Sequence, residues 1–363
     1  MMKKIIEPTL LLDKRKCLHN IEAMVNKAKR SNVIFRPHFK THQSREIGRW
    51  FRNFGVDCIT VSSLKMAQYF AADGWKDISV AFPANIREID RINELAGKIT
   101  LNVLVESPVV VSQLKNKLTA PVNVFLKIDV GYHRTGIAPE NFRVIDEILS
   151  EIESADLMTF KGFLTHAGHS YHAKSKADIT KIHNNSVQIL NWLKNKYKTY
   201  PEVILSIGDT PTCSIVDDLT GIDEIRPGNF VFYDVMQWNI GSCRLDQIAV
   251  AMVCPVVAKH SERNEIVIYG GAVHFSKEYM LTPEGEKCFG LLVELNQAGW
   301  IIPQKPAYLK SLSQEHGILK VKDDIFEKIH EGDLVSILPI HSCLTGNLVK
   351  SYLTLDGDII SRL

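Results

Sequence analysis

A short apolar stretch near the N-terminus ends in polar residues that could do chemistry. Residues 35–42 read Phe-Arg-Pro-His-Phe-Lys-Thr-His and place Lys40 directly after an apolar run. A lysine in a desolvated pocket has a lowered pKa, and its amine can then form an imine with an aldehyde cofactor. A lysine at a strand end is also often an ordinary surface residue. Lys40 is therefore a candidate nucleophile that needs support from the rest of the chain.

Two later loops have the composition of a phosphate-binding site. Residues 208–212, Gly-Asp-Thr-Pro-Thr, join an apolar run to a helix expected to start near Pro211. Backbone N–H groups and hydroxyls at a helix start can hold a phosphate. Gly228 and Asn229 follow the next apolar run and would form the other half of the site. Gly-Asp-Thr is also a common turn, so only the two loops together indicate phosphate binding.

His341 and Cys343 have the spacing of a pair of metal ligands. In an extended chain, side chains at i and i+2 point the same way, so an imidazole and a thiolate would converge on Zn2+. A buried cysteine beside a surface histidine explains the spacing more simply. Two protein ligands leave positions open on a metal, so a metal here would serve catalysis. Further polar candidates, each equally explained as a cap or turn residue, are Asp129, Asp209, Glu315 and His316.

The elements that must position these residues follow a regular alternation. Patterns of helical length, such as residues 85–98, 139–154 and 175–198, separate short apolar runs. Buried parallel strands read as continuous apolar runs, and eight of them alternating with helices predict an α/β fold, a (β/α)8 TIM barrel. An open doubly wound sheet is the alternative, but no Gly-x-Gly-x-x-Gly follows the first run. The eight runs are residues 33–37, 56–61, 77–82, 99–105, 121–129, 158–165, 202–207 and 222–226.

The reactive residue types gather at the C-terminal ends of these runs. In such barrels the loops after the strands form one rim, and chemistry takes place there. This placement favours a functional Lys40 over a surface lysine. The residues concerned are Lys40, Arg134, His166, Tyr171, Thr210, Arg226 and Gly228.

Beyond about Trp238 the pattern changes to short strands divided by Gly, Pro and charged turns. We expect a barrel over residues 13–238, with Asp13 as the N-cap of its first helix. Residues 1–12 and 239–363 are expected to form a second, mostly β domain. Its expected elements are an N-terminal strand at residues 4–12, strands at 246–258, 264–269, 307–313 and 333–338, and a helical patch at 285–298.

Composition excludes several classes of protein. The chain has 363 residues, a net charge of +2 and evenly spread Lys and Arg, which argues against nucleic acid binding. Glu7 and Pro8 interrupt the N-terminal apolar stretch too early for a signal peptide. The uncharged apolar run at residues 248–258 is shorter than the ~20 apolar residues of a membrane helix. The seven cysteines form no Cys-x-x-Cys pair, so we expect no disulfides. Together these features lead us to expect a cytoplasmic protein that acts on a small molecule.

Several motifs resemble those of the eukaryotic-type D-serine dehydratase and D-threonine aldolase family. These proteins belong with alanine racemase to the fold type III enzymes, which use pyridoxal phosphate (PLP). The resemblance runs from about residue 4 to the C-terminus and implies a barrel, a C-terminal β domain and a homodimer. The motifs that carry it, in the order of the family, are residues 36–42, 131–136, 168–171, 224–229 and 341–343.

The resemblance implies a role for each matching residue. Lys40 would be the Schiff-base lysine, and Arg226 would face the pyridine nitrogen of PLP. Arginine does not readily give up its proton, so the ring would stay unprotonated and be a weaker electron sink. The remaining cofactor positions would be Thr210, Gly228 and Asn229 at the phosphate, His166 and Tyr171 near the ring, and Arg134, Ser63 and Gln237 at other contacts.

The metal pair favours one reaction within the family over another. His341 and Cys343 match its metal ligands, whereas aldolase members often have Asp in the second place with Mn2+ or Mg2+. A thiolate prefers Zn2+ to those harder ions, which favours a lyase that converts D-serine to pyruvate and ammonia. Lys40 would remove the Cα proton. Aldol-type cleavage of a D-3-hydroxy amino acid, with His166 or His169 as base, is the alternative. A racemase needs no metal, and a non-catalytic PLP carrier has no use for the pair.

Overall fold

The structure is a computed structural model that describes residues 5–200, 202–296, 299–301 and 307–363. The chain divides into two compact units. One contains residues 22–228 with Leu363, and the other contains residues 1–21 and 229–362. The first boundary falls inside helix α1 (Lys14–Arg30), whose start is capped by Asp13 Oδ1 through the backbone N–H groups of Arg15 and Lys16. The second boundary places Asn229 and Gln237 in the unit of residues 1–21 and 229–362, which we call the β unit.

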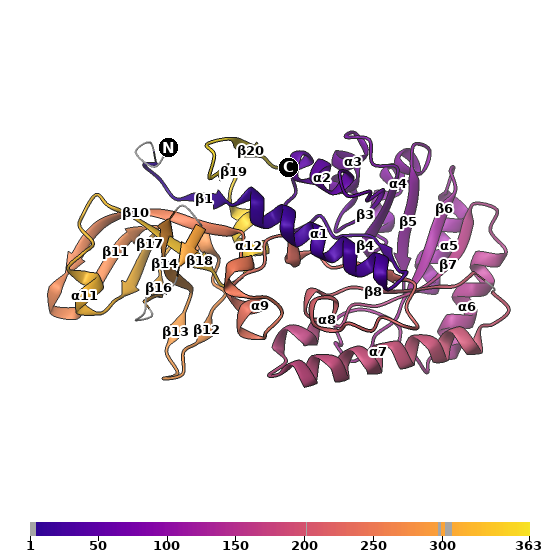
Figure 1. The fold of residues 1–363 in the computed structure, drawn as a ribbon. Coiled ribbons are helices and arrows are strands. Elements are labelled where there is room, and N and C mark those ends of the chain that lie inside the picture. The colour runs from indigo at the N-terminus through magenta and orange to yellow at the C-terminus, as the bar shows by residue number, and fades with distance from the viewer. Residues whose placement is uncertain (1–4, 201, 297–298, 302–306) are drawn as a thin grey trace. The chain divides into compact units, whose positions relative to one another are not determined.

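The unit of residues 22–228 is a nearly closed barrel of eight parallel strands (Figure 1). Its strand order is β2-β9-β8-β7-β6-β5-β4-β3, and a parallel bridge between His38 and Thr60 joins the two ends. This architecture confirms the predicted fold. The strands are β2 (Ile34–Phe35), β3 (Cys58–Val61), β4 (Asp77–Pro83), β5 (Thr100–Val105), β6 (Val122–Lys127), β7 (Met158–Leu164), β8 (Ile204–Ile207) and β9 (Glu224–Ile225).

Burial explains why the strands read as apolar runs. Every residue of β3 is buried, and Leu104, Phe125 and Leu164 from three neighbouring strands form one core cluster. The predicted helical patterns at residues 85–98, 139–154 and 175–198 contain α4, α6 and α7. The helices that connect the strands are α2 (Arg45–Arg52), α3 (Leu64–Ala71), α4 (Ile89–Ala96), α5 (Pro108–Lys117), α6 (Phe142–Glu153), α7 (Lys176–Lys196) and α8 (Thr210–Ile215).

The second unit contains an antiparallel β-barrel (Figure 1). Strands pair in the ring β10-β11-β17-β16-β14-β18 and back to β10, while β1 pairs with β10 and with β19. Burial alternates along β17, as expected where one face of a strand is covered. The strands are β1 (Thr9–Leu12), β10 (Val250–His260), β11 (Glu265–Tyr269), β12 (Met280–Leu281), β13 (Lys287–Cys288), β14 (Gly290–Asn296), β15 (Gly299–Ile301), β16 (Tyr308–Leu312), β17 (His316–Lys320), β18 (Leu334–Pro339), β19 (Ser351–Thr354) and β20 (Ile359–Ser361).

The helical patch predicted at residues 285–298 is wrong. Within it lie β13 (Lys287–Cys288) and β14, and residues 297–298 are outside the described residues. Pairing of β14 with β16 and β18 decides the conformation, because the spaced apolar residues fit a strand that is covered by partners on both sides. The predicted strand at 4–12 is also shorter, since β1 starts at Thr9; residue 4 is outside the described residues.

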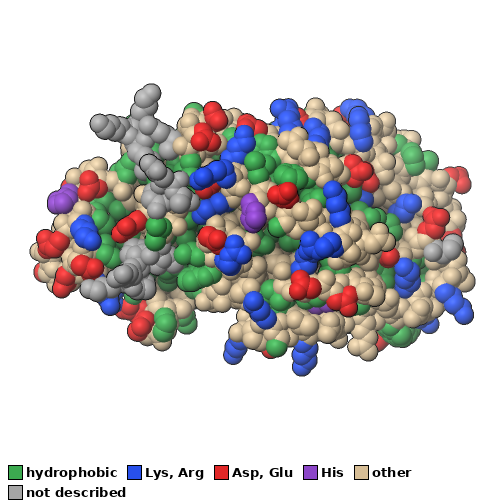
Figure 2. All heavy atoms as spheres, viewed as in Figure 1, with side chains coloured by type: hydrophobic (Ala, Val, Ile, Leu, Met, Phe, Trp, Pro, Cys, Tyr) green, Lys and Arg blue, Asp and Glu red, His purple; other side chains and the backbone are tan. Residues whose placement is uncertain are grey.

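The surface carries both signs of charge. Figure 2 shows Lys and Arg side chains interspersed with Asp and Glu over the face in view. Among the helices that the structure describes, none has the length and apolar character needed to cross a membrane.

Candidate active site

Lys40 lies just beyond β2, at the C-terminal end of the parallel barrel. Its backbone N–H donates to His38 Nδ1 at 3.3 Å. The Lys40 side chain is exposed, so the desolvated setting that the sequence suggested is wrong for this structure. His42, two residues on, is a core residue: burial lowers its pKa to about 3, and its ring centroid lies 4.5 Å from that of Phe39. Of the ionisable side chains at positions 40 and 42, only Lys40 is available for chemistry.

His166 follows β7 and is held in one tautomer. Its Nδ1 bonds to the carbonyl oxygen of Gly208, which can only accept, so the proton lies on Nδ1 and Nε2 keeps a lone pair. Burial lowers the pKa of His166 well below its usual value, and the positive charge of Lys40 lowers it further. Tyr132 and Tyr171 flank the ring, with centroids 5.9 Å and 6.4 Å away. His166 is therefore a neutral base beside Lys40.

Arg226 follows β9 and is almost fully buried. Its Nη1 donates to Ser206 Oγ and its Nη2 donates to the carbonyl oxygen of Thr165 at 2.7 Å. Burial lowers its pKa to about 10, against the attraction of Glu224, so the guanidinium remains charged at neutral pH. The structure thus places a fixed cation among the rim residues, next to the strands that precede His166 and Thr210.

The loops after β8 and β9 have features of an anion site. Helix α8 starts at Thr210, capped by Asp209, whose Oδ1 accepts from the Thr212 N–H at 2.8 Å. Thr210 Oγ1 is buried and has no hydrogen-bond partner among the described residues. At Gly228 a Cβ atom would lie 2.8 Å from the His38 carbonyl oxygen, so only glycine fits. A phosphate would supply the acceptor that the Thr210 hydroxyl lacks.

The loop after β6 is organised by Asp129. Its carboxylate accepts from the N–H groups of residues 131, 132 and 133, so the interpretation of Asp129 as a turn residue holds. Tyr132 is half-buried and packs on Gly168, where a Cβ would lie 2.3 Å from its ring. Arg134 places its guanidinium 5.0 Å from the Tyr132 ring centroid. Tyr132 is therefore part of the rim.

Lys127 is a rim residue that the sequence analysis missed. It is 6% exposed, and burial together with the charges of Arg226 and Arg134 lowers its pKa to about 7. Strand residues two apart share a face, so Lys127 lies on the same face of β6 as the core residue Phe125. A lysine inside the apolar run 121–129 was the available signal.

In the β unit, a second cluster brings together three of the predicted residues. Asn229 Nδ2 lies 3.5 Å from Cys343 Sγ and 2.6 Å from Asp234 Oδ2. Asp234 Oδ1 also accepts from the Gln237 N–H, and both polar atoms of the Gln237 side chain are buried without a partner in the described residues. Buried polar atoms without partners usually bond to a ligand or to water, so Gln237 is a candidate ligand-binding residue.

The extended chain expected through His341 and Cys343 is wrong. His341 is the N-cap of helix α12 (Ser342–Leu348), so the chain is not extended through Cys343. An imidazole and a thiol still form a donor set that suits Zn2+. No three His, Cys, Asp or Glu side chains gather closely enough to share a metal within the described part of the chain. The pair of protein ligands stays a prediction.

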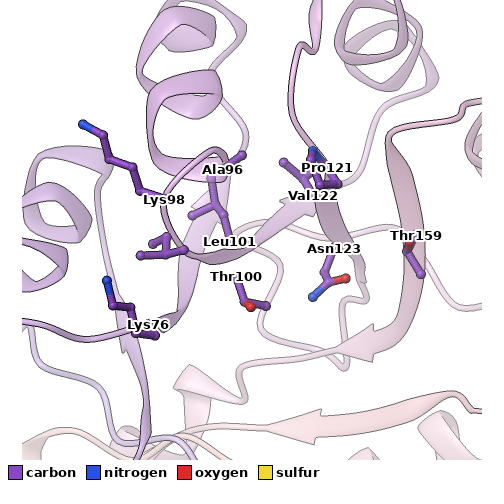
Figure 3. A pocket seen from close by; sticks show the side chains of 10 residues that line it. Lys76, Ala96, Lys98, Thr100, Leu101, Pro121, Val122, Asn123 and Thr159 are labelled. Atoms are coloured by element: carbon purple, nitrogen blue, oxygen red, sulfur yellow. The ribbon is translucent and has the colours of Figure 1, made fainter.

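A hollow lies at the opposite end of the parallel barrel, where β4 to β7 begin. Its volume is about 500 Å³, and Figure 3 shows the side chains that line it, among them Lys76, Lys98, Thr100, Asn123 and Thr159. Asn123 is already bonded to Asn102, and Lys98 to Glu94. The hollow offers little beyond exposed surface groups.

Comparison with known proteins adds the family. Residues 12–235 match the family described as "Alanine racemase, N-terminal domain", and residues 249–355 match "Putative serine dehydratase domain". The chain belongs to the alanine racemase-like, fold type III family. The family is PLP-dependent, and the chain is therefore an enzyme of the D-serine dehydratase and alanine racemase group. The predicted family is confirmed.

Individual relatives of this fold type III protein match over nearly the whole chain. D-serine dehydratase of Dictyostelium discoideum is 30% identical, covering 94% of this chain and 91% of its own. The structure of D-threo-3-hydroxyaspartate dehydratase from Delftia sp. HT23 has a TM-score of 0.90 and 25% identity, covering 100% and 98% of the two chains. A variant of that dehydratase in a metal-free form has a TM-score of 0.91 at 25% identity, with the same coverage.

Proposed function

We propose that this protein is a PLP- and Zn2+-dependent D-amino acid lyase that converts D-serine to pyruvate and ammonia. The observation that carries the proposal is the gathering of Lys40, neutral His166 and fixed Arg226 at one end of the barrel. PLP, when bound, supplies an aldehyde that links to amines and a ring that withdraws electrons from the substrate Cα. Similarity to a D-serine dehydratase over 94% of the chain supports the substrate class.

Each rim residue has a task that its chemistry allows. Lys40 Nζ is the amine that carries the cofactor and, once free, takes the proton from the substrate Cα. His166 Nε2 accepts a hydrogen bond near the ring, because its Nδ1 proton is committed to Gly208. Arg226 would face the pyridine nitrogen and keep its own proton, which would leave the ring a weak electron sink. The Thr210 hydroxyl and the backbone of Gly228 would hold the phosphate.

The weak electron sink makes a metal useful. His341 and Cys343 would hold Zn2+, which would supply Lewis acidity that makes the β-hydroxyl a better leaving group. The donor set supports this choice, because a thiolate binds Zn2+ more readily than Mg2+ or Mn2+. One structure of the similar D-threo-3-hydroxyaspartate dehydratase is a variant in the metal-free form, which agrees with the use of a metal by that relative.

A product assay tests the reaction. The purified enzyme with PLP and Zn2+ is offered D-serine, L-serine and D-threonine, and pyruvate, 2-oxobutyrate, glycine and acetaldehyde are measured. The proposal expects pyruvate and ammonia from D-serine and neither product from L-serine. Formation of D-serine from L-serine without pyruvate would identify a racemase and refute the lyase.

Aldol-type cleavage is the second candidate, favoured by one observation. His169 Nδ1 is buried without a hydrogen-bond partner within the described residues, and burial lowers the pKa of His169. A neutral imidazole of this kind could take the proton of a substrate β-hydroxyl. In the same assay, glycine with acetaldehyde from D-threonine indicates the aldolase, whereas 2-oxobutyrate with ammonia indicates the dehydratase.

The metal is tested separately. Dialysis against a chelator should abolish pyruvate release, and Zn2+ should restore it. Cys343→Ala should lose bound zinc, measured by elemental analysis of the protein, while Cys243→Ala keeps it. Cys243 is a partly buried cysteine of the same unit with no proposed role. Full activity in metal-free enzyme would refute the role of His341 and Cys343.

The family resemblance also leads us to propose a homodimer in the cytoplasm. Light scattering should give twice the chain mass of 41.0 kDa. A mass of one chain at micromolar concentration would contradict the dimer.

A further inference from the structure

A continuous chain of polar contacts runs from Arg226 through the buried interior of the parallel barrel. Arg226 Nη1 donates to Ser206 Oγ, and the Ser206 hydroxyl donates to Glu224 Oε1 at 2.5 Å. The other carboxylate oxygen of Glu224 accepts from Arg36 Nε at 2.6 Å. Arg36 also donates to both carboxylate oxygens of Asp77, at 2.6 Å and 3.0 Å. The charged side chains therefore alternate in sign along this series of contacts.

Chemistry fixes the direction of the hydrogen bonds in this chain. A guanidinium can only donate, and an ionised carboxylate can only accept. Ser206 has one hydroxyl hydrogen, so it accepts from Arg226 and gives that hydrogen to Glu224. Glu224 thus holds the Ser206 hydroxyl in the orientation that turns a lone pair toward the guanidinium. A hydroxyl without this partner would be free to rotate.

Burial makes this arrangement rigid. Ser206 and Glu224 are 0% exposed and Arg226 is 4% exposed, so water does not compete for these bonds. The guanidinium is held at two points, by Ser206 and by the carbonyl oxygen of Thr165. The plane of the Arg226 guanidinium is consequently set by residues of β8 and β9 and the loop after β7.

We propose that Ser206 is a positioning residue that, held by Glu224, aims the Arg226 guanidinium at the pyridine nitrogen of PLP. The inference rests on the proposed function and extends it, since Ser206 acts on the cofactor only through Arg226. A fixed guanidinium keeps one N–H directed at the ring nitrogen and so keeps that nitrogen unprotonated. Without the Ser206 contact the guanidinium moves, and the ring nitrogen loses its defined donor.

The test uses the full-length enzyme loaded with 15N-labelled PLP. The ring-nitrogen resonance reports hydrogen bonding and protonation at that atom, and a titration gives the PLP dissociation constant. Ser206→Ala removes the contact, and Ser206→Thr keeps a hydroxyl. Asp77→Asn changes the same chain at its far end, where the Asp77 side chain is 36% exposed. Thermal unfolding records the stability of each variant. If Ser206→Ala does not fold, Ser206→Cys takes its place, because a thiol is a weak donor of similar size.

Ser206→Ala should move the ring-nitrogen resonance and weaken PLP binding about fivefold or more, while Ser206→Thr keeps both near wild type. Asp77→Asn should lower the unfolding temperature without moving the resonance. A wild-type resonance that Ser206→Ala leaves in place, or that Asp77→Asn moves equally, overturns the inference and leaves the proposed function standing. Absence of any bound-PLP resonance in the wild type overturns the proposed function and the inference together.

Discussion

The two ends of the parallel barrel differ in whether their polar side chains have hydrogen-bond partners. The end where strands begin has the open hollow of about 500 Å³, but its Asn123 and Lys98 already have partners. The end where strands finish gathers Lys40, His166 and Arg226, with a buried and unsatisfied Thr210 hydroxyl beside them. An open hollow therefore does not by itself identify the end of this barrel that we propose to be functional.

The difference has a physical origin. Buried polar groups without partners and ionisable groups with displaced pKa values cost free energy, so a fold retains them where a ligand or a reaction compensates. Exposed groups at the other end cost little and indicate little. Matched substitutions at the two ends test this difference.

The largest contrast should come from lysines. Lys40→Ala removes the proposed base and cofactor anchor, and should lower the rate of pyruvate release from D-serine by about 1000-fold or more. Lys98→Ala removes an exposed lysine at the hollow and should leave the rate within about twofold of wild type. Initial rates at saturating D-serine provide the measurement. Similar losses in both variants would contradict the assignment of function to one end.

Buried and exposed acidic residues should differ in stability. Glu224→Gln removes the buried negative charge that Arg36 contacts directly and Arg226 reaches through Ser206, which should cost about 3–5 kcal/mol of unfolding free energy. Glu94→Gln, in an exposed pair with Lys98, should not change the urea midpoint measurably. Urea unfolding of both variants with the wild type makes the comparison. A small loss in Glu224→Gln would show that the buried charges are solvated in solution.

The contrast also shows what the sequence could reveal. Apolar runs predicted every strand of the parallel barrel, because buried parallel strands are apolar on both faces. Strand ends then placed Lys40, His166 and Arg226 at one rim. Arg36 and Glu224 lay within matching motifs but received no role, and Ser206 was not singled out, since their contacts join residues far apart in sequence. The strand β14 was mistaken for a helix for the same reason: its partners β16 and β18 lie later in the chain.

Lys127 should give a pH-dependent difference. Its pKa is about 7 in the folded state against 10.5 as the usual value, so between these pH values the unfolded chain binds more protons. Stability from this group therefore rises with pH over that window, on the order of 1 kcal/mol per pH unit. Lys127→Met should lose this rise in urea unfolding at pH 7 and pH 9, whereas Lys98→Met should keep it. Parallel slopes for wild type and Lys127→Met would refute the lowered pKa.

The smallest contrast concerns two threonines. Thr210→Val removes the hydroxyl proposed to bind phosphate and should weaken PLP binding about tenfold. Thr159→Val, at the hollow of Figure 3, should leave the dissociation constant unchanged. Absorbance titration with PLP measures both. Equal affinities in the two variants would remove Thr210 from the phosphate site.

The most direct test of the account locates the cofactor itself. The enzyme is incubated with PLP, reduced with borohydride and digested, and the peptides are examined by mass spectrometry. The account predicts the mass of reduced cofactor on the peptide containing Lys40, and none on peptides containing Lys76, Lys98 or Lys127. Cofactor on another lysine, or on none, would contradict the claim that Lys40 carries it.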